Sequence, residues 1–198
     1  MGMLAYARGV GSLGYKTESV GTAITQDIDP VPGARVSVHA FEALASTTAA
    51  DKLAFMVSLD QTTTNGAVAS AAATVVLTSA LAPAGAAVAA NDVVVFEMDD
   101  GTYHWTTVSS WTAGTLTMVV NDAFDDSMAD NAKVWCLGVS ADAGHRVFQL
   151  TSATTSTKEV DAGIFFGAGK GSPVRVHHPN ATGAAGAINY VSYSLIEK

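Results

Sequence analysis

A hairpin pattern near the middle of the chain restricts the fold more than any other feature. β-branched and aromatic residues predominate in 93–98 and 102–108, and Asp100-Gly101 lies between the two runs. Asp-Gly between two such runs is typical of a β-hairpin with a tight turn. A third run, 115–120, follows at once. We therefore predict an antiparallel meander of three strands.

The second arm of this hairpin alternates between two faces, as the period of two in a strand requires. One face would carry Tyr103, Trp105 and Thr107. The opposite face would carry His104, Thr106 and Val108. The pattern alone does not say which of the two faces is buried.

Similar runs bounded by turn residues recur along the rest of the chain. The further predicted strands are 34–42, 52–59, 74–78, 134–139, 146–151, 163–166, 174–177 and 188–195. About ten short strands at this spacing predict an all-β fold, either an antiparallel sandwich of jelly-roll type or a small barrel. The glycine-rich beginning predicts an extended N-terminal arm over 1–28, followed by a single β domain over 29–198.

The charge composition limits the possible partners. Ten Lys and Arg stand against 18 Asp and Glu, a formal net charge of -8, and charged residues make up 14% of the chain. Nucleic acids and anionic membranes select clustered cations, so we expect neither as a partner. A surface with so few charges is better explained if copies of the chain cover it, so we expect a homo-oligomer.

Two groups of residues have side chains of the kinds that bind metal ions. His177 and His178 are adjacent, so they point to opposite faces of a strand and cannot share a metal without distortion. An acidic loop over 122–130 could offer carboxylates to calcium, although its spacing differs from that of an EF-hand. Its acidic residues are Asp122, Asp125, Asp126 and Asp130. We expect no metal site and no cofactor.

The usual arrangements for covalent and phosphate chemistry do not occur. The glycine-rich segment 167–172 resembles a phosphate-binding loop, but it has Gly171 where Ser or Thr should follow the lysine. Cys136 lies in an apolar strand, where we expect a buried and inert thiol. We therefore expect no catalytic residues and no enzyme. The alternative is a hydrolase that uses His104 and Asp100 as an acid-base pair.

Aromatic residues around the meander leave a binding function open. Trp111 lies in a Ser-Ser-Trp-Thr segment, where we expect it to be exposed. An exposed aromatic beside polar groups can stack on a sugar. A carbohydrate-binding or receptor-binding β-sandwich is therefore the main alternative to a structural function.

The chain resembles virion structural proteins of tailed bacteriophages. Three segments carry this resemblance: Asp29 to Val36, Ala90 to Val95 and Asp100 to His104. The likeness spans most of 29–196, and a binding module in a head fibre or a tail would look similar. It implies a capsid decoration (cement) protein that binds the major capsid protein lattice as a trimer and stabilises it. It also implies a location on the capsid exterior after synthesis in the host cytoplasm. In that setting the segment 1–21 would contact a neighbouring subunit or the shell.

Overall fold

A computed structural model describes residues 6–19, 23–45, 52–139, 145–150, 155–166, 170–179 and 186–197, with 6–19 and 155–166 described by their backbone. These ranges contain fourteen strands and one short 3₁₀ turn (Pro83–Gly85). The predicted all-β class is confirmed. In this part of the chain no helix has the length and apolarity needed to cross a membrane.

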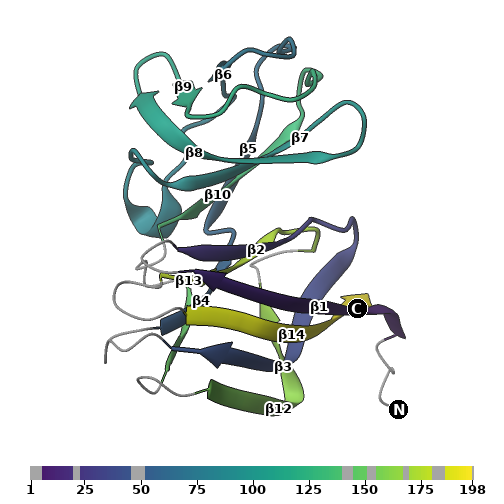
Figure 1. Cartoon of the computed structure of the whole chain (residues 1–198). Helices are drawn as coiled ribbons and strands as arrows, with labels where there is room; N and C mark the ends of the chain where they lie inside the picture. Colours follow the sequence, from purple (N-terminus) through teal and green to yellow (C-terminus); the bar gives the residue numbers. More distant parts are fainter. Residues whose placement is uncertain are drawn as a thin grey trace. The chain divides into compact units, whose positions relative to one another are not determined.

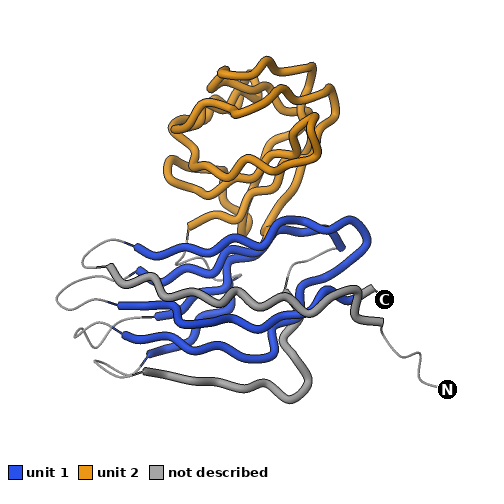
Figure 2. Tube along the Cα trace, turned by 45° about the vertical axis from the view of Figure 1, so that its right-hand side comes forward, with its two compact units in different colours: residues 1–57, 145–198 blue, residues 58–144 orange. Residues whose placement is uncertain are grey.

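The chain divides into two compact units, coloured separately in Figure 2. Unit 1 consists of residues 1–57 and 145–198, and unit 2 consists of residues 58–144. Unit 2 is thus an insertion in the sequence of unit 1. The sequence predicted a single domain over 29–198. That the two units fold and unfold together as one domain stays a prediction.

Unit 1 contains two four-stranded antiparallel sheets, drawn in Figure 1. The first has the order β1-β14-β3-β12 and consists of β1 (Tyr6–Ser19), β14 (Gly186–Glu197), β3 (Ala34–Leu44) and β12 (Thr155–Phe166). The second has the order β11-β4-β13-β2 and consists of β11 (Arg146–Gln149), β4 (Lys52–Val57), β13 (Val174–His178) and β2 (Ile24–Ile28).

Successive strands of unit 1 alternate between the two sheets, from β1 to β4 and again from β11 to β14. Eight strands arranged in this way form a double-sheet jelly roll. Phe41 of one sheet packs on Phe55 and Phe148 of the other, with ring centroids 5.7 and 5.0 Å away. These rings lie between the sheets, so the two sheets form a sandwich with one core.

The N-terminal segment differs from the predicted arm where it is described. Tyr6–Ser19 is extended, but it forms the edge strand β1 and pairs along its length with β14 of the same chain. The predicted arm also contains β2, which pairs with β13. Sequence analysis missed both strands because glycine and polar residues interrupt any alternation in them.

Unit 2 is a six-stranded antiparallel sheet in the order β5-β10-β7-β8-β9-β6. Its strands are β5 (Asp60–Thr63), β6 (Thr74–Val76), β7 (Val93–Glu97), β8 (Tyr103–Thr112), β9 (Thr117–Val120) and β10 (Lys133–Gly138). The predicted meander is confirmed, because β7 pairs with β8 and β8 pairs with β9. The hairpin turn places Gly101 at φ 83°, which glycine adopts without strain.

Backbone contacts join the two edges of this sheet and close it into a small barrel. Thr64 and Leu77 form an antiparallel bridge. The Asn65 amide donates to the Val76 carbonyl over 2.8 Å, and the Thr78 amide donates to the Thr63 carbonyl over 2.9 Å. We call these three contacts the closing seam. Closure leaves the sheet without a free edge, and a free edge is the usual site of unwanted strand pairing.

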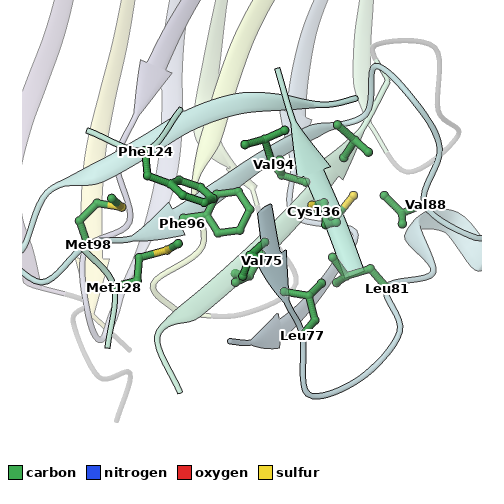
Figure 3. Close-up of a cluster of buried hydrophobic side chains, with 14 residues drawn as sticks. Val75, Leu77, Leu81, Val88, Val94, Phe96, Met98, Phe124, Met128 and Cys136 are labelled. Atoms are coloured by element: carbon green, nitrogen blue, oxygen red, sulfur yellow. The ribbon is translucent and has the colours of Figure 1, made fainter. Parts of the chain in front are cut away.

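Apolar side chains fill the interior of the barrel (Figure 3). The buried cluster consists of Val75, Leu77, Leu81, Val88, Val94, Phe96, Met98, Val108, Met118, Val120, Phe124, Met128, Val134 and Cys136. Cys136 is fully buried, as its position in an apolar strand predicts. Phe96 and Phe124 meet edge to face with ring centroids 5.0 Å apart. Unit 2 therefore has a core of its own.

Candidate functional site

Strand β8 carries two polar side chains on its buried face. The alternation predicted from the sequence is confirmed, and the face with His104 and Thr106 is the buried one. Polar groups that are buried in this way need hydrogen-bond partners. Both partners come from the acidic loop 122–130, which the sequence analysis considered only as a source of carboxylates for calcium.

The loop is fastened to β8 by two carboxylates. His104 Nδ1 lies 2.9 Å from Asp125 Oδ2, and the Thr106 hydroxyl donates to Asp122 Oδ2 over 3.0 Å. The His104 side chain is 5% exposed and that of Asp125 is 88% exposed. The acidic loop thus places its carboxylates at the surface while they satisfy groups that point into the barrel.

The other ring nitrogen of His104 has no such contact. Nε2 is buried and has no hydrogen-bond partner, and the ring packs on Phe124 with centroids 5.3 Å apart. A general base must reach the proton that it removes. Since Nε2 faces the core and Nδ1 faces Asp125, His104 is placed to hold the loop rather than to meet a substrate.

Asp100, the acid-base partner that the hydrolase alternative required, does not pair with His104. Its Oδ1 accepts hydrogen bonds from the Thr102 hydroxyl at 2.6 Å and the Thr102 amide at 2.8 Å. Both hydrogen bonds lower the pKa of the Asp100 carboxyl, and the one from the Thr102 hydroxyl has the larger effect. This local turn stabilises the hairpin, and the expected pair is not formed.

The remaining acidic residues of the loop do not converge on one point. Asp130 Oδ1 accepts a hydrogen bond from the Gly66 amide over 2.8 Å, whereas Asp122 and Asp125 contact β8. The part of the chain that the structure describes holds no group of three or more His, Cys, Asp or Glu that could bind a metal ion.

The two adjacent histidines of β13 lie on opposite faces, as predicted. His178 is buried, and its Nε2 lies 3.0 Å from the Leu44 carbonyl oxygen. His177 is half-buried, and burial lowers its pKa to about 4, with smaller contributions from Arg175, His178 and His145. Arg175 makes a two-point ion pair with Asp27, at 2.6 and 2.8 Å. These groups stabilise the sheet and do not share a ligand.

The aromatic residues around the meander are buried or half-buried. Trp111 is half-buried and packs against the barrel core, although the sequence predicted an exposed side chain. Trp135 is buried and meets Tyr103 edge to face, with ring centroids 6.0 Å apart. The glycine-rich candidate 167–172 lies partly outside the described residues, since 167–169 are not described.

The free strand edges are the remaining feature that could meet another molecule. Unit 2 has its edges joined, whereas the two sheets of unit 1 end in β1 and β12 and in β11 and β2. On β11 the side chain of Val147 is 43% exposed. Edge strands can pair with another chain, so unit 1 holds the candidate assembly surfaces among the described residues.

Comparison with known proteins gives little further information. No family model matches the chain, and no curated protein matches it. One solved structure found is VP17, a capsid protein of bacteriophage P23-77, at 12% identity and a TM-score of 0.25, over 97% of this chain and 99% of that one.

A second solved structure is a complex of the two major capsid proteins of the same phage, VP16 and VP17. Here the identity is 11% and the TM-score 0.25, over 95% of this chain and 100% of that one. A TM-score this low does not establish a shared fold.

Proposed function

We propose that this chain is a virion structural protein that acts as one of many copies in a capsid. The strand order of unit 1 carries the proposal, because double-sheet jelly rolls recur in viral capsid proteins. Lectins and cupins share this architecture, so the fold alone does not decide between them.

The surface chemistry favours assembly over ligand binding. Only 14% of the residues are charged, and a surface of neutral small residues is well suited to repeated contacts between copies. The two side chains on which the alternative functions depend are engaged with the chain itself. His104 is held by Asp125, and Trp111 packs on the barrel core.

The finer assignment implied by the sequence resemblance is a decoration protein. In this version trimers of the chain bind the lattice of a major capsid protein on the exterior of the shell, and weak contacts repeated over the shell give avidity. The strand order of unit 1 favours a different version, in which the chain forms the shell itself. In both versions the chain is not an enzyme.

Mass measurement and co-sedimentation separate these versions. The purified chain is examined by light scattering and electron microscopy, and then sedimented with emptied phage capsids. A trimer that pellets with capsids supports decoration, whereas closed shells or sheets formed by the chain alone support a shell subunit. A monomer that does neither contradicts the proposal.

The binding-module alternative has its own test. A glycan screen that gives a ligand lost on Trp111→Ala, with the fold retained, would favour a sugar-binding domain. Trp105→Ala serves as the matched control, since Trp105 is half-buried on the same strand.

A further inference from the structure

The turn that follows β5 contains the only Asn-Gly pair in the chain, Asn65-Gly66. Both residues are exposed. Gly66 has φ +93°, and no atom beyond its two neighbours in the chain lies within 4 Å of the position that a Cβ would take there. Within the described contacts no hydrogen bond holds the side-chain amide of Asn65. The pair is therefore open to a reaction between the Asn65 side chain and the next backbone nitrogen.

That reaction needs no partner other than water. The Gly66 nitrogen loses its proton and attacks Cγ of Asn65, so a nitrogen–carbon bond forms as the bond from Cγ to the side-chain nitrogen breaks. The side-chain nitrogen leaves as ammonia and a five-membered succinimide remains. Water then opens one of its two carbonyls, which gives aspartate or isoaspartate at position 65.

A hydrogen bond in the folded chain lowers the reactivity of the attacking nitrogen. The Gly66 amide donates to Asp130 Oδ1 over 2.8 Å, and a hydrogen bond from an amide to a carboxylate is stronger than one between neutral groups. Attack requires the loss of this same proton, and the adjacent negative charge opposes the negative charge that develops on nitrogen. Asp130 therefore disfavours the first step.

The backbone before the pair is restrained as well. The Asn65 amide donates to the Val76 carbonyl in the closing seam, next to the bridge between Thr64 and Leu77. Attack on Cγ requires the backbone of Asn65 to rotate toward the side chain. A residue that is hydrogen-bonded in the closing seam rotates less freely than the same residue in an unfolded chain.

We propose that Asn65 is a self-modification site, where deamidation converts it to aspartate or isoaspartate, and that Asp130 restrains this conversion. The product would place a second carboxylate beside Asp130. Isoaspartate would also add a backbone carbon within the closing seam. Both changes weaken the seam, so the reaction would limit the lifetime of the closed barrel.

The test follows the folded chain by peptide mass mapping during storage at neutral and mildly alkaline pH. Deamidation is seen as the mass gained when NH₂ is replaced by OH, and chromatography separates the aspartate and isoaspartate peptides. Asp130→Ala should convert about tenfold faster than the unchanged chain, the change in rate that corresponds to one charge-assisted hydrogen bond. Asp126→Ala, which removes a carboxylate from the same loop, should convert at the unchanged rate.

Two further samples keep the test decisive. The chain unfolded in urea should convert faster than the folded chain, since the seam is absent. Asp130→Asn, which keeps an acceptor oxygen without the charge, should lie between the unchanged chain and Asp130→Ala, and it replaces Asp130→Ala if that variant does not fold.

Three outcomes would overturn the proposal. The first is that position 65 stays unmodified in every folded variant while the unfolded chain reacts, which would mean that the folded protein has no such site. The second is equal rates for Asp130→Ala and the unchanged chain, which would remove Asp130 as the restraint. The third is equal acceleration by Asp126→Ala, which would indicate a general effect of charge.

Discussion

Replacing the exposed Asp125 should destabilise unit 2 more than replacing the buried His104. The Asp125 carboxylate lies 2.9 Å from His104 Nδ1, and His104 Nε2 already lacks a partner. Asp125→Ala would therefore leave a ring that is 5% exposed without any hydrogen bond. A buried polar group left unsatisfied costs about 1–3 kcal/mol, so we expect the free energy of unfolding to fall by about that amount.

His104→Leu removes the same hydrogen bond from the other side, at a smaller cost. The substitution takes away both ring nitrogens, including the one that is already unsatisfied, and it leaves Asp125 with water, since its side chain is 88% exposed. The loss of the contact between the His104 and Phe124 rings costs about 0.5–1.5 kcal/mol. Burial of the leucine offsets most of this, so we expect a change of about 1 kcal/mol or less.

Urea unfolding followed by tryptophan fluorescence measures these changes. All three tryptophans, Trp105, Trp111 and Trp135, belong to unit 2, so the signal reports on the barrel. Asp126→Ala is the matched control, and a surface change of this kind should stay within about 0.5 kcal/mol. The reasoning is refuted if Asp125→Ala behaves like this control, or if His104→Leu loses more stability than Asp125→Ala.

Three further perturbations test other parts of the structure. Burial of His177, with a smaller effect of Arg175, lowers its pKa from 6.5 to about 4. Between these two pH values the unfolded chain carries a proton on His177 that the folded chain lacks. Stability should therefore fall as pH drops from 6.5 toward 4, and His177→Gln should flatten this dependence in urea titrations at several pH values. Arg175→Met, which breaks the two-point pair with Asp27, should cost about 1–3 kcal/mol, seen as a lower urea midpoint. Gly101→Ala should cost about 1 kcal/mol because Gly101 has φ 83°, whereas Gly114→Ala should cost less in the same assay.

The sequence predicted the local features of the fold and missed the distant ones. The meander over 93–120 followed from the period of two and from Asp100-Gly101, since both act between neighbours in the chain. The pairing of β1 with β14 joins the two ends of the chain, and no local pattern encodes it. For the same reason the sequence did not reveal that 58–144 forms a separate compact unit.

The sequence likewise predicted the local part of the candidate site and missed the part that depends on distant residues. The period of two placed His104 on one face with Thr106 and Val108, and that face is the buried one. The partner of His104 was sought in Asp100, four residues away, because nearness along the chain was the available guide. The actual partner, Asp125, is 21 residues away and depends on how the acidic loop folds over β8.

The most direct test of a virion structural function is to look for the chain in the virus particle. The proposal implies that a virus encodes the chain, so particles of that virus would be purified on a density gradient and the chain quantified by mass spectrometry against the main shell protein. The proposal predicts a copy number comparable with that of the shell subunits, or identity with the shell protein itself. Absence of the chain from purified particles, or its presence in only a few copies, would contradict it.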